Sequence, residues 1–299
     1  MEKSAMIIIN PTSGKEKAAS YEARIKEELK VKYSNLVVKH TKGEGDATKF
    51  AREACEDNFD FVVSLGGDGT VNETVNGLAN FENPPLLGII PLGTVNSLAR
   101  ALNIPIKPEK AIEILKNDYY KKIDVGLVNG KYFTNILGVG EAAKAVYDVD
   151  IENKAKFGPL AYVIAIGKEI LKDDVFPVRL EMDDEIWEGE ISVIIIGLLD
   201  SLGGLKSFLT DVEIGNGTMH ILAIKSLNVS KLIGVAPSLA FGRITDTENI
   251  EYFQTKKLKL STLDKSQYKS NVDGDEGPEL PLEIKVLPRH LRVISTEKQ

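Results

Sequence analysis

The stretch DFVVSLGGDGTVNETVNGL, residues 60–78, joins a short apolar run, a glycine-rich turn and a helical pattern. Residues 61–65 are mostly apolar and rich in β-branched side chains, which predicts a buried strand of a parallel sheet. Glycines interrupt residues 66–69, and apolar side chains recur at helical spacing from Val71 onward. The stretch therefore predicts a strand, a glycine turn and a helix in direct succession.

A turn of this kind is suited to hold an anion. Glycines let backbone amides approach a phosphate at positive φ, and the following helix presents unpaired N–H groups. Asp68 lies inside the turn, where its carboxylate would repel a phosphate unless a divalent cation or water lay between them. An ordinary turn in which Asp68 caps the helix explains the same residues equally well. Asp68 is expected to face solvent, so its removal should change stability by no more than about 0.5 kcal/mol.

The composition is that of a soluble globular protein: 299 residues, 43% apolar and 27% charged, which is enough for two cores. A formal net charge of −7 argues against a nucleic-acid partner, which would require a basic face. The single cysteine excludes an intrachain disulfide, and the three histidines show no metal-ligand spacing. No apolar run is long enough for a signal peptide or a transmembrane segment, so we expect a cytoplasmic protein.

Strands alternate with helices in the first part of the chain. Three further strands are predicted at residues 5–9, 35–40 and 86–90. Ser13 and Glu16 have capping-box spacing and predict the start of a helix whose apolar face lies over residues 21–29. Such alternation specifies an α/β fold with a doubly wound parallel sheet.

Four loops follow these strands, beginning at Asn10, Thr41, Gly66 and Gly93. In parallel sheets of this type, ligands bind at the carboxyl ends of the strands. We therefore expect the four loops to share one edge of the sheet and to form the candidate binding site.

The pattern changes from residue 121 onward. Two alternating runs flank Asn129-Gly130, a strong type I′ hairpin signal. Strand-like runs then recur at 178–182, 190–197, 219–225, 257–260 and 282–286, with one predicted helix at 162–172. A second, mostly antiparallel β domain is therefore predicted to begin near Asp124.

Six motifs occur along the chain: NPTSGK at 10–15, GGDGT at 66–70, PLGTVNSLAR at 91–100, KIDVG at 122–126, FTN at 133–135 and VDGD at 272–275. In this order they resemble the bacterial diacylglycerol kinase family, which is related to phosphatidylglycerol, sphingosine and ceramide kinases. GGDGT alone is shared with NAD kinases and phosphofructokinases, whereas the combination is specific. The resemblance implies a lipid kinase that transfers the γ-phosphate of ATP to a lipid hydroxyl, with a diacylglycerol-type substrate and Mg²⁺.

The resemblance also implies the architecture. An NAD-kinase-like α/β nucleotide-binding domain would cover residues 1–123 with a returning tail at 289–299, and an antiparallel β-sandwich lipid-substrate domain would cover residues 124–288. The active site would lie in the cleft between them. The implied partner is a lipid at the membrane surface in phospholipid biosynthesis, with peripheral membrane association, no transmembrane segment and no nucleic acid. The oligomeric state stays open, a homodimer included.

The site residues follow from the motifs and from the loops at the sheet edge. Asp68, Asp124 and Asp275 form the implied catalytic set, with Asp275 at the position of the base, where the family usually has glutamate, and with the adjacent Glu276 as the alternative. Asp68, Asp124 and Asn216 are the implied metal ligands. The implied nucleotide contacts are Asn10, Pro11, Thr12, Ser13, Gly14, Thr41, Gly66, Gly67, Asp68, Gly69, Thr70, Val71, Asn72, Glu73, Thr94 and Asn96.

Two alternative functions remain open on the sequence. One is a soluble-substrate kinase related to NAD kinase, and the other is a non-enzymatic nucleotide-binding regulatory protein that keeps the fold. Apolar residues also gather around Gly203-Gly204, where they would contact lipid or pack in a core: Leu198, Leu199, Leu202, Leu205, Phe208 and Leu209.

Overall fold

The computed structural model describes residues 2–140, 175–198, 214–225 and 249–296, and the backbone of β11 (Ser201–Leu202) and β12 (Leu205–Lys206). The chain divides into two compact units. The α/β unit comprises Met1–Val125 and Arg289–Gln299, and the sandwich unit comprises Gly126–Pro288. The helix predicted at residues 162–172 lies outside the described residues.

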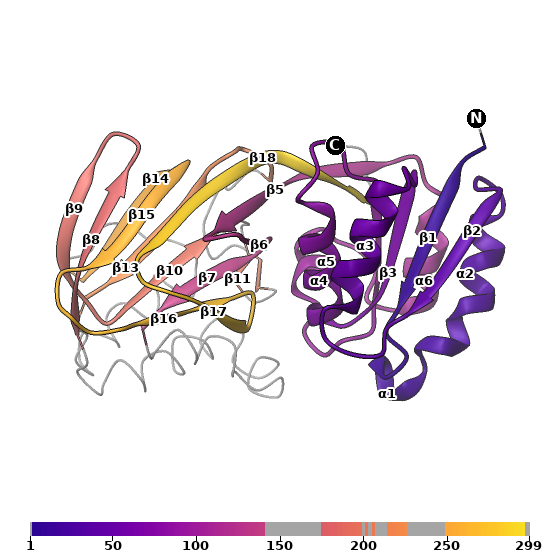
Figure 1. The fold of residues 1–299 in the computed structure, drawn as a ribbon, viewed down its shortest axis with the longest axis horizontal. Coiled ribbons are helices and arrows are strands. Elements are labelled where there is room, and N and C mark those ends of the chain that lie inside the picture. The colour runs from indigo at the N-terminus through magenta and orange to yellow at the C-terminus, as the bar shows by residue number, and fades with distance from the viewer. Residues whose placement is uncertain are drawn as a thin grey trace. The chain divides into compact units, whose positions relative to one another are not determined.

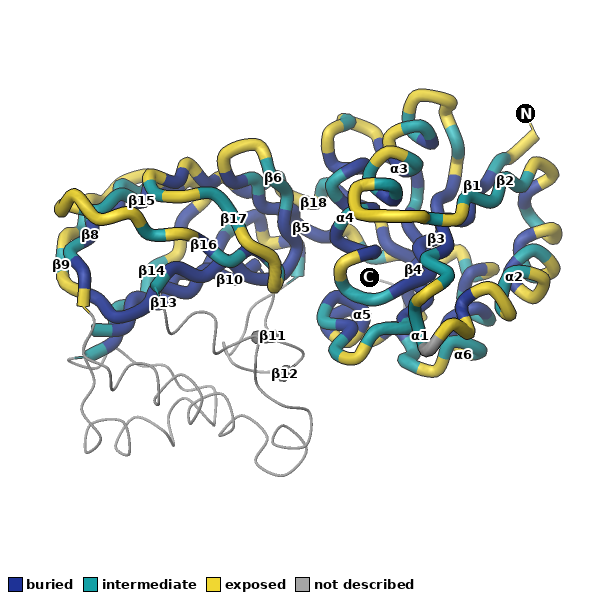
Figure 2. Tube along the Cα trace, turned by 60° about the horizontal axis from the view of Figure 1, so that its bottom comes forward, coloured by how far each residue is buried: buried dark blue, intermediate teal, exposed yellow. Residues whose placement is uncertain are grey.

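A parallel sheet forms the centre of the α/β unit, in the strand order β2-β1-β3-β4-β18. The two central strands, β1 and β3, are almost fully buried, which explains their continuous apolar sequences. Figure 2 shows these strands among the buried parts of the chain. The strands are β1 (Ser4–Ile9), β2 (Asn35–His40), β3 (Phe61–Gly66), β4 (Leu86–Pro91) and the end of β18 (Leu282–Ile294).

Helices connect these strands (Figure 1). They are α1 (Ser13–Glu16), α2 (Glu22–Leu29), α3 (Asp46–Glu56), α4 (Asp68–Leu78), α5 (Ser97–Ala101) and α6 (Pro108–Glu113), with 3₁₀ turns η1 (Ala18–Tyr21) and η2 (Ile114–Lys116). Helices α3 and α4 pack closely because Gly77 has no Cβ, and a Cβ there would lie 2.4 Å from the carbonyl oxygen of Thr48.

Among the described residues, two large sheets form the sandwich, in the orders β6-β5-β18-β15-β8-β9 and β14-β13-β10-β7-β16-β17, and β11 and β12 form a separate antiparallel pair. The facing sides of the two large sheets share one core, which includes Phe133, Leu180 and Leu260 from the first sheet and Leu137 and Ile196 from the second. The strands are β5 (Tyr120–Val128), β6 (Lys131–Phe133), β7 (Ile136–Val139), β8 (Phe176–Met182), β9 (Ile186–Ile191), β10 (Val193–Gly197), β13 (Met219–Ile224), β14 (Ile250–Thr255), β15 (Lys257–Thr262), β16 (Lys269–Val272) and β17 (Asp275–Glu279).

The predicted hairpin at Asn129-Gly130 is confirmed. Strands β5 and β6 pair antiparallel, and the φ angles of 44° at Asn129 and 90° at Gly130 are those that a type I′ turn requires. The single strand expected at 190–197 is wrong. The chain forms β9 and β10 there, and these strands belong to different sheets on either side of Ser192.

The expected capping box is also wrong. Thr12, not Ser13, precedes α1, and no side chain caps the starts of α1 or α2. Glu16 has a φ of 66°, which ends α1 after a single turn. The side chain of Asn10 organises this turn instead, because its Oδ1 accepts hydrogen bonds from the amide and the hydroxyl of Thr12.

Within the described residues, no helix is both long and apolar enough to cross a membrane. Of the apolar residues around Gly203-Gly204, Leu198 is 1% exposed and belongs to the sandwich core. This burial favours core packing for Leu198. Leu199, Phe208 and Leu209, and the side chains of Leu202 and Leu205, lie outside the described residues.

Candidate active site

The four loops expected at one sheet edge do meet there. The strand register aligns Ile9 with both His40 and Leu65, and Leu65 with Ile90. Each of these strands ends at this level or one residue beyond it, so the loops that follow open at the same carboxyl edge. This confirms the expected position of the loops that begin at Asn10, Thr41 and Gly66 and of the loop that follows β4.

A pocket of about 330 Å³ lies among three of these loops, within the usual size range of small-ligand sites. Six of the expected nucleotide contacts line it: Asn10, Thr12, Thr41, Gly69, Thr70 and Glu73. Sequence reasoning missed four further lining residues: Lys42, Gly43, Glu44 and Ala47. Their signal was their position in the loop after β2 and the first turn of α3, at the same edge as the glycine turn. The remaining expected contacts do not line the pocket: Pro11, Ser13, Gly14, Gly66, Gly67, Asp68, Val71, Asn72, Thr94 and Asn96.

Hydrogen bonds between loops hold this pocket together. The Asn10 amide group donates to the Thr70 hydroxyl at 3.0 Å, which ties the end of β1 to α4. The backbone N–H of Ala47 donates to Glu73 Oε2 at 3.0 Å, so the side chain of Glu73 caps the start of α3. The polar side chains of the pocket are thereby held in place before any ligand arrives.

The glycines of the turn serve close approach rather than positive φ, so that part of the expectation is wrong. None of Gly66, Gly67 and Gly69 has a positive φ. A Cβ on Gly66 would lie 2.5 Å from the Thr70 side chain, and one on Gly67 would lie 3.3 Å from Gly93 Cα. A Cβ on Gly69 would meet no atom within 4 Å. Gly69 therefore leaves open space at the N-terminus of α4, where a phosphate can approach the backbone amides.

Asp68 connects two loops. Its Oδ2 accepts the backbone N–H of Asn96 at 2.7 Å, and its Oδ1 accepts that of Ser97 at 2.6 Å. These two amides stand at the start of α5, so Asp68 lies at the start of α4 but caps the neighbouring helix. The half-buried carboxylate of Asp68 therefore holds the starts of α4 and α5 together. The expected stability change of at most about 0.5 kcal/mol on its removal is too small, because hydrogen bonds to a charged group are lost.

The side chain of Asn96 also holds the loop after β4 in place. It accepts the N–H of Gly93 and donates to the carbonyl of the same residue, both at 2.8 Å, and it is only 5% exposed. Asn96 itself has a φ of 53°, which asparagine tolerates better than most residues. Its side chain thus shapes the loop that carries Thr94, an exposed residue beside it.

Asp124 is fully buried where β5 reaches the end of the α/β unit. Its Oδ1 accepts the backbone N–H of Arg289 at 2.7 Å. Arg289 has a φ of 50°, a conformation that arginine seldom adopts without external support. The carboxylate of Asp124 therefore stabilises the bend in β18 at the point where that strand enters the α/β unit.

The VDGD motif of the sandwich unit forms a two-residue hairpin turn. Asp273 and Gly274 occupy the turn with φ angles of 52° and 102°, and Val272 pairs with Asp275 across it. Asp273 accepts three backbone N–H groups, from Thr134 at 2.8 Å, Asn135 at 3.1 Å and Ile136 at 2.8 Å. Asp273 thus binds the FTN motif to the turn from which Asp275 projects.

Burial raises the pKa of Asp273 from 3.8 to about 6. The three hydrogen bonds from backbone amides lower this pKa, but burial has the larger effect. Between pH 4 and 6 the folded state keeps a proton that the unfolded state has released, so this group's contribution to stability falls as pH rises. We expect a loss of roughly 3 kcal/mol across this window, since one pKa unit corresponds to about 1.4 kcal/mol.

Urea unfolding of wild type and Asp273→Asn at several pH values measures this effect. The free-energy difference between the two proteins should shift in favour of the variant as pH rises from 4 to 6. A difference that stays constant, or that shifts the other way, would contradict the raised pKa.

Asp275 and Glu276 point to opposite faces of the hairpin, because Asp275 lies opposite Val272 and Glu276 lies opposite Asn271. The carboxylate of Glu276 forms an ion pair with Lys269 at 2.7 Å. Asp275 is exposed, and its charge contributes to the raised pKa of Asp273, after burial as the main cause. The two carboxylates therefore lie on different faces of the hairpin, so a substrate on one face would meet only one of them.

The expected metal ligands do not form a cage. Among the described residues, no group of three or more His, Cys, Asp or Glu side chains is arranged to hold a metal. The Oδ1 of Asn216 accepts the amide and hydroxyl of Thr218, both at 2.9 Å, within its own turn. Mg²⁺ at phosphate sites takes only one or two protein carboxylates, with phosphates and water as its other ligands, so the residues present are compatible with a metal brought by a nucleotide.

Comparisons with known proteins agree with this arrangement. Residues 4–128 match the diacylglycerol kinase catalytic domain, and residues 136–295 match the YegS C-terminal NAD kinase beta sandwich-like domain. The chain is 36% identical to a diacylglycerol kinase of Bacillus subtilis, over 99% of this chain and 98% of that one. It is 33% identical to a diacylglycerol kinase of Staphylococcus saprophyticus, over 99% and 96%. A crystal structure of a diacylglycerol kinase from Bacillus anthracis matches with a TM-score of 0.78 at 26% identity, over 99% and 97%.

The α/β unit with a pocket at the carboxyl edge of its sheet, followed by the β-sandwich, defines an ATP-dependent kinase of the lipid kinase class. The chain belongs to the diacylglycerol kinase family. The expected family and fold class are thereby confirmed, and neither alternative function is favoured.

Proposed function

We propose that the chain transfers the γ-phosphate of ATP to the free hydroxyl of a diacylglycerol-type lipid. The observation that carries the proposal is the pocket at the carboxyl edge of the parallel sheet, lined by residues of three loops beside the start of α4. Similarity to relatives named diacylglycerol kinase supports the choice of lipid.

The α/β unit binds the nucleotide in this scheme. Backbone amides at the start of α4 take the phosphates, where the helix dipole is positive. Asn10, Thr70 and Glu73 provide the polar side chains of the adjoining pocket. Lys42 also lines this pocket, together with the carboxylates of Glu44 and Glu73, so the attraction for phosphate comes from the backbone amides of α4.

Asp68 and Asp124 are the protein carboxylates proposed to hold Mg²⁺ with the triphosphate and water. When bound, Mg²⁺ neutralises charge that develops on the phosphates. Asp68 has a second task that does not depend on the metal. It holds the loop of Thr94 beside α4 through the amides of Asn96 and Ser97.

Asp275 is proposed as the general base, which accepts the proton of the lipid hydroxyl as the oxygen attacks the γ-phosphorus. Glu276 is the weaker candidate, because its carboxylate already pairs with Lys269. Asp273 acts through the turn as a positioning residue for Asp275.

The protein is further proposed to work at a membrane surface from the cytoplasmic side, since its substrate is a lipid. A homodimer is compatible with this function. Sedimentation velocity of the purified chain measures the oligomeric state, and fractionation of expressing cells measures the membrane association.

Substitution of Gly69 tests the nucleotide site with little effect on the fold. We expect Gly69→Ala to keep or raise stability, because its Cβ has no neighbour within 4 Å and alanine favours a helix by about 1 kcal/mol. The same Cβ occupies the space where a phosphate would approach, so ATP affinity should fall at least about tenfold. Isothermal titration calorimetry with a non-hydrolysable ATP analogue measures this affinity.

Gly77→Ala is the matched control. Its Cβ would lie 2.4 Å from the carbonyl oxygen of Thr48, so stability should fall by about 1 to 3 kcal/mol through overpacking. ATP affinity of the folded variant should stay near wild type. Wild-type ATP affinity in Gly69→Ala would argue against phosphate binding at α4.

Transfer of labelled γ-phosphate from ATP to a total lipid extract, with chromatography of the product, tests the function directly. We expect one labelled product that comigrates with phosphatidic acid, and none with Asp275→Asn. Label in a soluble product, or ATP binding without transfer to any lipid, would contradict the proposal.

A further inference from the structure

Two segments of the sandwich unit, far apart in the sequence, are joined by hydrogen bonds. The hairpin segment, residues 129–136, comprises the Asn129-Gly130 turn, β6 and the rest of the FTN motif. The base segment, residues 273–283, runs from the VDGD turn through β17 to the start of β18 and carries Asp275. The bonds lie at both ends of the base segment and beside Asp275.

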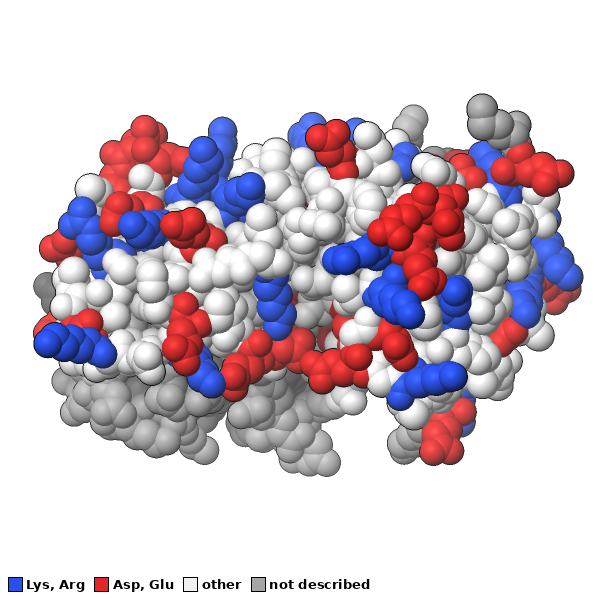
Figure 3. Space-filling view, viewed as in Figure 1, with Lys and Arg blue, Asp and Glu red and all other residues white. Residues whose placement is uncertain are grey.

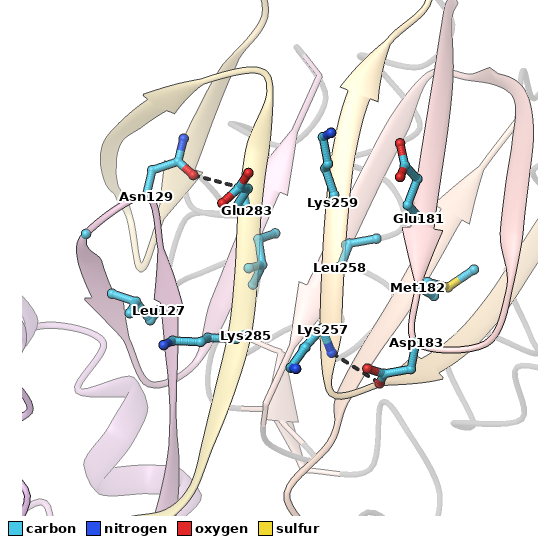
Figure 4. Close-up of a pocket in the computed structure, with 12 residues that line it drawn as sticks. Leu127, Asn129, Glu181, Met182, Asp183, Lys257, Leu258, Lys259, Glu283 and Lys285 are labelled. Carbon is cyan, nitrogen blue, oxygen red and sulfur yellow. Dashed lines mark hydrogen bonds between the residues drawn. The ribbon is translucent and has the colours of Figure 1, made fainter.

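Both ends of the base segment are held firmly. At one end, Asp273 accepts three backbone N–H groups of the hairpin segment, and its own N–H donates to the carbonyl of Ile136 at 2.9 Å. At the other end, the side chain of Asn129 donates to the carbonyl of Pro281 at 3.0 Å. Its Oδ1 accepts the N–H of Glu283 at 2.8 Å, a bond that Figure 4 shows. The hairpin segment is therefore a fixed support for the strand between these ends.

Between these ends, β17 is held irregularly by its own sheet. It is the last strand of that sheet, with β16 as its strand neighbour among the described residues. The register of the two strands shifts between Lys269 and Asn271, and Pro278 has no N–H to donate to the ladder. Every residue of β17 is exposed or half-buried. The position of Asp275, the first residue of β17, therefore depends on contacts from outside this sheet.

Lys131 makes such a contact directly beside Asp275. It belongs to β6, in the other large sheet, and its ammonium group donates to the backbone carbonyl of Glu276 at 3.1 Å. Glu276 follows Asp275, so the bond fixes the backbone one residue from the carboxylate of Asp275. A displacement of about 1 Å at a reacting group can lower a rate about 10²-fold, so a backbone contact at this place affects the reaction more than the fold.

We propose that Lys131 is a positioning residue for the base, which holds β17 where the carboxylate of Asp275 meets the hydroxyl of the lipid. This role rests on the proposed function, in which Asp275 is the base. Lysines are interleaved with acidic residues over the visible surface (Figure 3), so charge alone does not mark a functional lysine. Lys269 provides the contrast, because its ammonium pairs with the carboxylate of Glu276, not with the backbone, at 2.7 Å.

Steady-state transfer to diacylglycerol in mixed micelles tests this role. Lys131→Met should lower kcat about tenfold and leave the KM for ATP and for diacylglycerol within about twofold of wild type. Lys131→Arg keeps the charge and the donor groups and should stay within about threefold of wild type. The control Lys269→Met removes the same charge next to the same residue and should change kcat less than about twofold. Equal losses in Lys131→Met and Lys269→Met, or no loss in Lys131→Met, would overturn the positioning role.

A double variant shows whether Lys131 acts through the base. Lys131→Met added to Asp275→Asn should lower the residual rate less than about twofold, because no base is left to position. A further loss of about tenfold would mean that the two residues act independently, and would overturn the positioning role.

Hydrogen exchange of the β17 amides, measured by mass spectrometry, tests the contact without any activity. Lys131→Met should exchange these amides at least about threefold faster than wild type, with a melting temperature within about 2 °C of wild type. Unchanged exchange would show that Lys131 does not hold β17. If wild type transfers no phosphate to lipid, the proposed function fails, and the exchange rates still decide whether Lys131 holds the strand.

Discussion

Asp275→Asn is expected to lower kcat by about 10² to 10⁴-fold, the usual contribution of a general base. The carboxylate stands at the exposed start of β17, next to the turn that Asp273 anchors through three backbone amides. The substitution preserves size and removes only the basic oxygen. ATP affinity should stay within about twofold of wild type, because Asp275 belongs to the sandwich unit and the nucleotide pocket to the α/β unit. Steady-state transfer to diacylglycerol in mixed micelles measures kcat.

Two control variants make this result specific. Asp275→Glu should keep or raise activity, because the resemblance places glutamate at this position. Glu276→Gln should change kcat less than about threefold, since that carboxylate pairs with Lys269 on the other face of the hairpin. A large loss in Glu276→Gln with near-normal Asp275→Asn would reverse the assignment of the base.

Asp68→Ala should combine a loss of stability with a loss of transfer. It removes two hydrogen bonds to the carboxylate, at 2.6 and 2.7 Å, from the backbone of the loop after β4. Because hydrogen bonds to charged groups contribute about 1.5 to 3 kcal/mol each and this carboxylate is only half-buried, we expect the free energy of unfolding to fall by about 2 kcal/mol. A shift of about 1 Å in the loop that carries Thr94 is enough to lower kcat about 10²-fold.

Asp60→Ala is the matched control for Asp68→Ala. Asp60 lies just before β3, at the opposite end of that strand, and its Oδ2 accepts the amide of Ser4 at 2.8 Å. Its loss should lower stability slightly and leave kcat unchanged.

A Mg²⁺ titration of Asp68→Ala separates the two tasks of Asp68, since high Mg²⁺ would restore activity if the carboxylate served only the metal. Wild-type stability and activity in Asp68→Ala would show that neither task matters.

The sequence by itself determined several strands, helices and turns, and the edge of the parallel sheet at which the loops of the candidate site lie. Residues 61–65 are mostly apolar and rich in β-branched side chains, and the glycines after them weaken a strand, so strand, turn and helix follow from local chemistry. In a parallel sheet the loops that follow the strands lie at one edge, so the sequence already predicted that Asn10, Thr41 and Gly69 lie near one another. The hairpin at Asn129-Gly130 was equally local, because a type I′ turn needs two residues that tolerate positive φ.

Only the tertiary structure decided which partners the polar side chains of these loops take. Asp68 bonds to amides 28 and 29 residues away, and Asp273 to amides more than 130 residues away. Lys131 bonds to the carbonyl of Glu276, 145 residues away. Such contacts depend on strand order and register, which the packing of a whole unit sets and which no local pattern encodes. For the same reason the residues around Ser192 had the apolar pattern of one strand but form two, since the chain changes sheets there.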